Sequence, residues 1–326
     1  MEYQMNLHTN KKLFYDAVMA ASEEFRMAPE FIEKDYWICQ ILQKLSRHSN
    51  ADRIVWKGGT SLSKAYGLIK RFSSDVDFAV LTEDLSQNRQ KKLVSRIGKD
   101  TTIDLEEIVL PDKTIKNNRY RKTYHGYKSV IQQKNSGLTF LGNHVIVEIN
   151  TYGNPYPYTR RIVQPFIAEM ITRRNLNDMF FEYDMMPFAL NVLDKRRTLC
   201  EKIVSLLRFS FEDNPAEGVA SKIRHFYDLY YLCQDKECRE FLSTDFRKEL
   251  TELIAHDKKE FDKPTRWRDS PVQKSPLLTD FRSLWIEISA IYRTELGALS
   301  YGELPHEDAV ESSTTELLSI VKEILG

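Results

Sequence analysis

The chain has 326 residues, enough for one large domain or two ordinary ones, each with its own hydrophobic core. Its 47 basic and 47 acidic residues cancel to a formal net charge of zero, so bulk charge does not indicate a nucleic-acid partner. No apolar run approaches the roughly 18 residues of a membrane span, and the first residues lack the pattern of a secretion signal. We therefore expect a soluble, cytoplasmic protein with no membrane contact.

The four cysteines form no Cys-x-x-Cys pair, and three of them lie in helix-like apolar patterns. We interpret them as reduced thiols rather than as a disulfide or a zinc site. They are Cys39, Cys200, Cys233 and Cys238.

Helices and strands are expected to mix in the first part of the chain, and helices to dominate the rest. The expected helices cover two stretches within 9–46, with Pro29 at a helix start, then 60–69 and a polar stretch at 84–98. The expected strands cover 53–56, 75–81, 102–110, about 118–132 and 143–152, while 161–172 gives mixed signals. From about residue 185 the periodicity is helical almost to Gly326, interrupted at 262–276. This predicts an α+β domain with a mixed sheet over 1–180 and a helical domain over 181–326.

A pair of motifs carries the strongest functional signal. The run Lys57-Gly58-Gly59-Thr60-Ser61 follows a predicted strand and opens a helix. Glycines let the backbone approach a phosphate closely, and a helix start offers N–H groups that no carbonyl of the helix accepts.

The second motif, Asp75-Val76-Asp77, begins the next predicted strand. Residues two apart on a strand point to one face, about 6.5–7 Å apart along the chain. Two carboxylates at that distance repel by roughly 2–3 kcal/mol at an effective dielectric constant of 20, and a divalent cation removes this cost. Either motif alone is weak, but together they predict a polymerase-β-type nucleotidyltransferase core.

The sequence around these motifs resembles the AbiEii/AbiGii-type toxin family, the MenT-like nucleotidyltransferases of bacterial toxin–antitoxin and abortive-infection systems. Four segments carry the resemblance, which runs from about residue 30 to 232. They are Ile32-Glu33-Lys34-Asp35-Tyr36-Trp37, the run from Lys57 to Asp77, Thr198-Leu199-Cys200-Glu201-Lys202, and Arg224-His225-Phe226-Tyr227-Asp228.

The resemblance implies transfer of a nucleotide from an NTP, with Mg²⁺, onto an RNA acceptor, and a cognate antitoxin encoded nearby. In the best understood members the acceptor is the 3′ end of tRNA, which blocks translation and growth. Residue by residue, it assigns catalytic roles to Ser73, Asp75, Lys202 and Asp228.

Glu148 is the candidate for a third metal carboxylate beside Asp75 and Asp77. It interrupts the apolar run from Val145 to Ile149, and the polymerase-β scheme needs an acid on a strand beside the dyad. The alternative is an ordinary strand residue that faces outward.

Lys202 falls at the rim of the apolar face of its helix. A lysine among apolar neighbours needs an anion to keep its charge, and a triphosphate would supply one. The alternative is a side chain that reaches out to solvent.

Asp228 is expected to orient Lys202 or an arginine toward phosphate. The alternative is an ordinary helix pair with Arg224, four residues earlier. Lys34 and Asp35 are expected in a buried network that braces the site rather than in direct contact with substrate.

Residues 113–134 form a basic strip that contains no acid, and tyrosines are interleaved in it. Phosphate contacts and stacking on a single-stranded RNA end would explain this composition, and so would a solvated strand face. The strip comprises Lys113, Lys116, Arg119, Arg121, Lys122, Lys128 and Lys134, with Tyr120, Tyr124 and Tyr127.

Two other functions remain open. The same core could transfer a nucleotide to a protein or a small molecule, and the chain could be a non-catalytic nucleotide-binding subunit. The intact dyad and Lys202 favour an enzyme.

Overall fold

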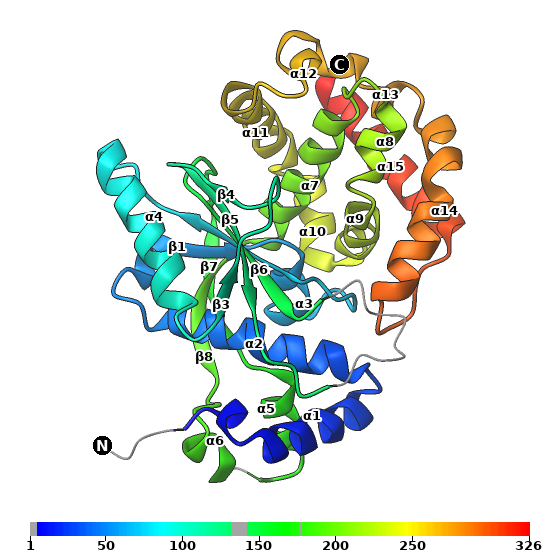
Figure 1. The fold of residues 1–326 in the computed structure, drawn as a ribbon. Helices are drawn as coiled ribbons and strands as arrows, with labels where there is room; N and C mark the ends of the chain where they lie inside the picture. Colours follow the sequence, from blue (N-terminus) through cyan, green and yellow to red (C-terminus); the bar gives the residue numbers. More distant parts are fainter. Residues whose placement is uncertain (1–4, 132–141, 177) are drawn as a thin grey trace. The chain divides into compact units, whose positions relative to one another are not determined.

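The computed structural model describes residues 5–131, 142–176 and 178–326 and divides the chain into two compact units (Figure 1). The first unit contains Met1–Ala65 and Phe72–Leu193, and the second contains Tyr66–Arg71 and Asp194–Gly326. The main break between the two units follows Leu193. A short segment of the second unit also interrupts the first.

The first unit combines one sheet with several helices. Its strands are β1 Ile54–Lys57, β2 Asp75–Val80, β3 Glu106–Ile108, β4 Ile115–Lys116, β5 Tyr120–Gly126, β6 His144–Asn150, β7 Tyr158–Val163 and β8 Phe188–Leu193. Its helices are α1 Lys11–Phe25, α2 Pro29–Ser46, α3 Gly59–Lys64, α4 Gln87–Thr101, α5 Phe166–Arg173 and α6 Asp178–Glu182, with short 3₁₀ turns at Leu7–Thr9 and Ala51–Arg53.

The sheet is mixed and runs in the order β3-β5-β6-β2-β1-β8-β7, with β4 paired to β5. β2 lies parallel to β6 and antiparallel to β1, and β1 lies parallel to β8. This confirms the α+β fold with a mixed sheet.

Because successive strand residues point to opposite faces, the register sorts side chains into two sets. One row runs across neighbouring strands as Val192, Trp56, Phe78 and Ile149, each of which is almost completely buried. Helix α4 packs on this face, since its Gly98 lies against Ile149. This apolar face thus forms part of the core of the first unit. The opposite face carries Asp77 and Glu148 together with the buried side chains of Val55 and Ala79.

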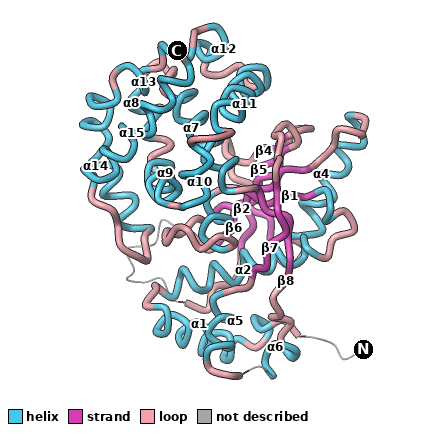
Figure 2. The backbone as a smooth tube through the Cα atoms, turned by 180° about the vertical axis from the view of Figure 1, so that it is seen from behind, coloured by secondary structure: helices cyan, strands magenta, loops and turns pink. Residues whose placement is uncertain are grey.

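In the described part of the chain, the second unit consists of helices, turns and loops, apart from an isolated β-bridge between Arg71 and Ser300 (Figure 2). Its core includes the aromatic side chains of Phe226, Trp267 and Trp285. Its helices are α7 Lys195–Phe209, α8 Pro215–Ala220, α9 Arg224–Gln234, α10 Lys236–Leu242, α11 Phe246–Glu260, α12 Thr265–Asp269, α13 Pro276–Thr279, α14 Phe281–Leu299 and α15 Glu307–Leu325, with a 3₁₀ turn at Val272–Lys274.

Two expectations about elements need correction, and the mixed signals at 161–172 are resolved. Residues 188–193 form strand β8 rather than helix, because they pair with β1 and β7. Helix α3 ends at Lys64, well before residue 69, and Gly67 beyond it has a positive φ. The segment at 161–172 divides into the end of β7 and helix α5. None of the helices in the described ranges is long and apolar enough to cross a membrane.

Candidate active site

The glycine turn and the aspartate strand lie in direct contact. β1 ends at Lys57, which pairs with Asp77 of β2, and Gly58 follows with φ +86° and ψ −173°. A Cβ placed on Gly58 would lie 2.3 Å from Oδ2 of Asp77. Only glycine leaves room for this carboxylate, so the first motif shapes the position of the second.

The hydroxyl groups of the turn hold it in place. Thr60 Oγ1 donates a hydrogen bond of 2.6 Å to the backbone oxygen of Asp75, and Ser61 Oγ donates one of 2.8 Å to the carbonyl of Gly58. Both side chains are buried. Any phosphate cradle at this turn would therefore use backbone N–H groups rather than these hydroxyls. The predicted triphosphate site at Lys57, Gly58, Gly59, Thr60 and Ser61 stays a prediction.

Asp75 and Asp77 are half-buried and share the polar face of β2, as their spacing predicts. Two carboxylates on one strand face suit a hard divalent cation that prefers oxygen ligands. Among the residues that the structure describes, no three His, Cys, Asp or Glu side chains gather closely enough to hold a metal ion. The dyad thus fits a metal as a pair, and a complete ligand set stays a prediction.

Glu148 lies on the same face, directly beside Asp77 in the parallel register of β2 and β6. Its carboxylate accepts a 2.6 Å hydrogen bond from Tyr120 Oη and pairs with Lys122 Nζ at 2.7 Å. Burial lowers the pKa of Lys122, but the hydrogen bond and charge of Glu148 outweigh this and raise it. Glu148 thus lies beside Asp77 in the sheet with its oxygens engaged by Tyr120 and Lys122, and its role as a metal ligand stays a prediction.

Ser73 lies just before β2 and is buried. Its predicted contact with phosphate or metal-bound water stays a prediction. Ser74 next to it donates a weak 3.3 Å hydrogen bond to Oδ1 of Asp75.

Lys34 and Asp35 are both buried on α2 but belong to different groups of side chains. Asp35 pairs with Lys64 of α3 at 2.9 Å and accepts a 2.8 Å hydrogen bond from the backbone N–H of Phe166. Burial lowers the pKa of Lys34 to about 8, while the charges of Asp75 and Glu33 act in the opposite direction. Asp35 thus braces the helix that begins at the glycine turn.

In the second unit, Lys202 and Asp228 lie together. Lys202 Nζ is 2.6 Å from Asp228 Oδ2, and both side chains are buried. The same carboxylate binds Arg71, while Arg224 pairs with Glu295. These contacts favour the expected pairing of Asp228 with Lys202 over the intrahelical alternative. The anion beside Lys202 is a carboxylate of the chain itself.

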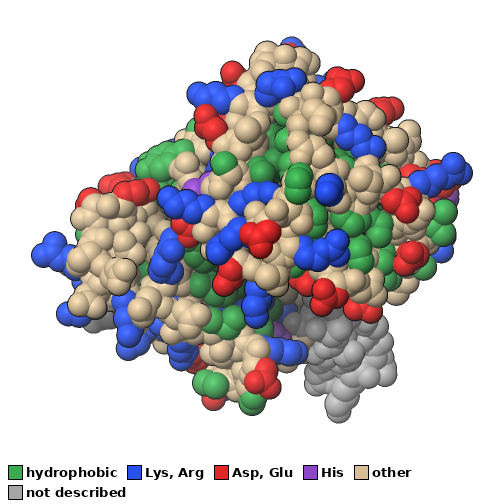
Figure 3. Space-filling view, turned by 90° about the horizontal axis from the view of Figure 1, so that it is seen from above, with side chains coloured by type: hydrophobic (Ala, Val, Ile, Leu, Met, Phe, Trp, Pro, Cys, Tyr) green, Lys and Arg blue, Asp and Glu red, His purple; other side chains and the backbone are tan. Residues whose placement is uncertain are grey.

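The cations of the basic strip differ in their partners and in their exposure. Lys116 pairs with Glu107 and Lys122 with Glu148, while Lys113, Arg119 and Lys128 are exposed. The tyrosines do not form a continuous stacking surface, because Tyr124 is buried and Tyr127 stacks on Trp37. Lys134 lies outside the described residues. On the face drawn in Figure 3, Lys and Arg side chains lie among acidic ones.

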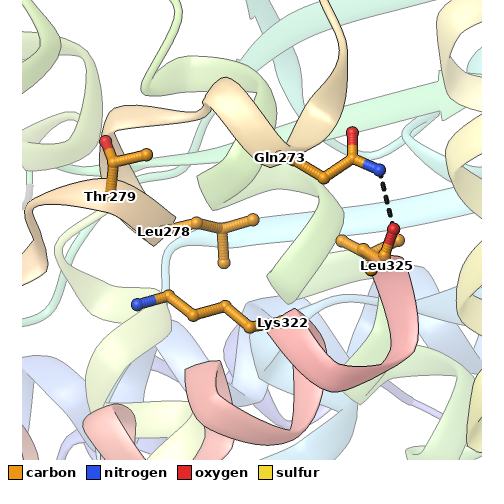
Figure 4. A pocket seen from close by; sticks show the side chains of 6 residues that line it. Gln273, Leu278, Thr279, Lys322 and Leu325 are labelled. Carbon is orange, nitrogen blue, oxygen red and sulfur yellow. Dashed lines mark hydrogen bonds between the residues drawn. The ribbon is translucent and has the colours of Figure 1, made fainter.

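A hollow of about 320 Å³ lies elsewhere, within the second unit (Figure 4). It is lined by residues of the Val272–Lys274 turn, α13 and the end of the chain, and Gln273 Nε2 donates a 2.7 Å hydrogen bond to the carbonyl of Leu325. None of the predicted site residues lines it.

Sequence reasoning missed Arg71 and Lys64. Both lie inside the run from Lys57 to Asp77, so the sequence shows that each is a cation in the motif region. Their partners, Asp228 and Asp35, are distant in sequence, and no local pattern joins them.

A glycine turn set against an Asp-x-Asp strand in a mixed sheet is the arrangement of a polymerase-β-type nucleotidyltransferase. The family described as "Nucleotidyl transferase AbiEii toxin, Type IV TA system" matches residues 40–311, and the chain belongs to this family. It is thus a nucleotidyltransferase toxin of a type IV toxin–antitoxin system, a family that implies an NTP substrate and an antitoxin partner.

Among solved structures, the fold is similar to that of MenT4, a nucleotidyltransferase toxin from Mycobacterium tuberculosis H37Rv. The TM-score is 0.56 and the sequence identity 16%, over 94% of this chain and 89% of that chain. No match to a curated protein was found.

Proposed function

We propose that the chain transfers a nucleotide from an NTP to an RNA acceptor, the 3′ end of tRNA, and thereby blocks translation. The observation that carries this proposal is the Asp75–Asp77 pair on one strand face, with Asp77 fitted against Gly58. In the proposed reaction an acceptor hydroxyl attacks the α-phosphorus in line, and pyrophosphate leaves. The proposed compartment is the cytoplasm, where NTPs and tRNA occur together.

Asp75 and Asp77 would hold Mg²⁺, with Glu148 as the proposed third ligand. When bound, the ion would offset the negative charge of the triphosphate and orient it. The residues of the chain would do the rest: the turn at Gly58 would admit phosphate close to the backbone, and Lys202 would neutralise the outer phosphates. Ser73 would contact phosphate or ordered water.

RNA as the acceptor is supported by exposed cations that lie just before and just after strands β4 and β5 in the chain. The Arg119 guanidinium lies 5.9 Å from the ring centre of Tyr152, and Lys113 and Lys128 are also exposed. Arginine and aromatic surfaces of this kind stack on unpaired bases. The inward packing of Tyr124 and Tyr127 removes two stacking groups, so a protein or small-molecule acceptor is the competing proposal.

Transfer can be tested by incubating the protein and Mg²⁺ with total RNA and each NTP in turn, labelled at the α- or the γ-phosphate. Nucleotidyl transfer predicts that the α-label joins RNA and that the γ-label is released. Label on polypeptide would support the competing acceptor. No transfer from any NTP would contradict the proposed function.

The dyad is tested in the same assay with Asp75→Ala and Asp77→Ala. We expect each to lower the rate more than about tenfold while the protein stays folded, because removal of one carboxylate leaves the cation poorly held. Asp84→Ala is the matched control. Asp84 is an exposed acid that follows the same strand, β2, and its carboxylate pairs with Arg53. A variant that keeps more than about a tenth of the rate would show that its aspartate does not hold the metal.

A further inference from the structure

The segment Tyr66–Arg71 belongs to the second unit although the chain on both sides of it belongs to the first. Its backbone is fixed at two places. The N–H of Lys70 donates to Tyr227 Oη at 3.3 Å, and Arg71 forms an antiparallel bridge with Ser300 in which the N–H of Tyr301 donates to the carbonyl of Lys70 at 2.9 Å. The position of Arg71 is thus set by α9 and by the turn after α14.

Arg71 binds Asp228 through two hydrogen bonds at once. Its Nε donates to Oδ1 at 2.7 Å and its Nη2 donates to Oδ2 at 2.6 Å. The two side chains are 4% and 0% exposed, so water does not compete for these bonds. Burial raises the pKa of Asp228, but Arg71 and Lys202 together outweigh it and hold this pKa well below its usual range.

This geometry restricts Lys202. A guanidinium fork fixes the plane of a carboxylate, whereas an ammonium group is a compact charge without a preferred direction. Arg71 binds both oxygens of Asp228, and Lys202 shares Oδ2 with it, at 2.6 Å. Without Arg71, the carboxylate could turn and draw the ammonium group across both of its oxygens.

We propose that Arg71 is a positioning residue for nucleotide binding: it fixes the Asp228 carboxylate and thereby the place of the Lys202 ammonium group. This rests on the proposed function, in which Lys202 binds the triphosphate. Arg71 acts through Asp228 and does not touch the substrate.

Kinetics of Arg71→Lys test the proposal, because this variant keeps the charge and loses the fork. We expect KM for the NTP to rise about tenfold with a much smaller change in kcat, within the range that misplacement of a binding group produces. In an Asp228→Asn background, Arg71→Lys should change KM little further, since its effect passes through that carboxylate. Arg224→Gln is the control, because Arg224 lies on the same helix as Asp228, α9, and pairs with Glu295.

A second measurement separates failure of this proposal from failure of the proposed function. The rate of reductive methylation of Lys202, followed by mass spectrometry without any nucleotide, reports how firmly its ammonium group is held. Arg71→Lys and Arg71→Gln should both change that rate, with Lys222 as the internal reference.

Two results would overturn the proposal. One is an unchanged KM in a folded Arg71→Lys protein that has only lost thermal stability. The other is an unchanged methylation rate at Lys202, which decides the matter even if the wild-type protein transfers no nucleotide. The methylation result also decides it if Asp228→Asn does not fold.

Discussion

Two glycines with positive φ differ in what surrounds them. Gly58 has φ +86° and ψ −173°, a region that is essentially restricted to glycine, and a Cβ there would strike Oδ2 of Asp77. Gly67 has φ +64°, and no atom lies within 4 Å of the place of its Cβ. The first glycine is required by the site, and the second only by its backbone.

Gly58→Ala should therefore abolish transfer, whereas Gly67→Ala should only destabilise the fold. A positive φ costs an alanine about 1–2 kcal/mol, so both variants should have a lower free energy of unfolding than the wild type. The displacement of Asp77 is specific to Gly58→Ala. Unfolding curves and transfer rates of the two variants check this, and a Gly58→Ala protein with normal transfer would mean that Asp77 tolerates the added methyl group.

At this same scale, the helical pattern around Lys202 predicts that it needs an anion, and only the family resemblance suggests Asp228 as its partner. The structure supplies Asp228, together with Arg71, from positions that no helical or strand period connects to 202. Residue types and their faces are local properties, and their pairing is not.

Among the elements, α2 shows why a single apolar stripe underestimates burial. The apolar stripe of α2 is buried, and so are Lys34 within the width of that stripe and Glu33 on another side of the helix. The stripe comprises Phe31, Ile38, Ile41, Leu42 and Leu45. The reason is that α2 contacts α1, α4, α5 and two strands. Its charged residues are therefore held by partners, as when Glu33 accepts hydrogen bonds from Ser129 and from the backbone of Val130.

Strand β8 is not predicted, because its local sequence does not specify a strand. Phe188–Leu193 is a short and mostly apolar run, and such runs do not distinguish a strand from a buried helix. Its parallel partner β1 lies more than a hundred residues earlier in the chain. Strands β2 and β6, by contrast, are predictable because their alternation is local and strong.

Strand β5 provides a prediction about pH. Burial lowers the pKa of His125 to about 4, although the charge of Glu107 acts in the opposite direction. In the unfolded chain this histidine titrates near 6.5, so between these values the unfolded state binds more protons. Its contribution to stability is thus lost as the pH falls through this window. Between pH 7 and pH 5 we expect a loss of about 1–2 kcal/mol from this residue.

His125→Gln should reduce this acid sensitivity, because glutamine does not titrate. The measurement is the free energy of unfolding by urea at pH 7 and at pH 5, for wild type and variant. Equal losses of stability in the two proteins would show that His125 is not the group responsible.

For the whole molecule, a net charge of zero conceals how its charges are used. Several cations are committed to partners inside their own unit, as Arg71 is to Asp228, Lys64 to Asp35 and Lys122 to Glu148. The sequence shows the number of such charges but not which of them remain available to an external phosphate. It also cannot show that Tyr66–Arg71 belongs to the second unit, because that depends on contacts with residues far along the chain.

The acceptor surface is tested by removing only exposed cations. Lys122 is unsuitable because it pairs with Glu148, so we choose Lys113→Ala, Arg119→Ala and Lys128→Ala in one triple variant.

If the strip holds RNA, the triple variant should bind tRNA more weakly. The slope of log affinity against log salt is negative, and its magnitude should decrease by roughly 0.7–1 unit for each phosphate that the protein no longer binds. KM for the NTP should hardly change. A second triple variant, Lys263→Ala, Arg266→Ala and Lys274→Ala, removes the same charge from exposed sites in the second unit and should leave RNA binding unaltered. Equal tRNA affinity and salt slope in wild type and the first triple variant would exclude the strip as the RNA surface. The acceptor would then have to be held elsewhere, or be a protein, and the α-label on polypeptide would decide between these.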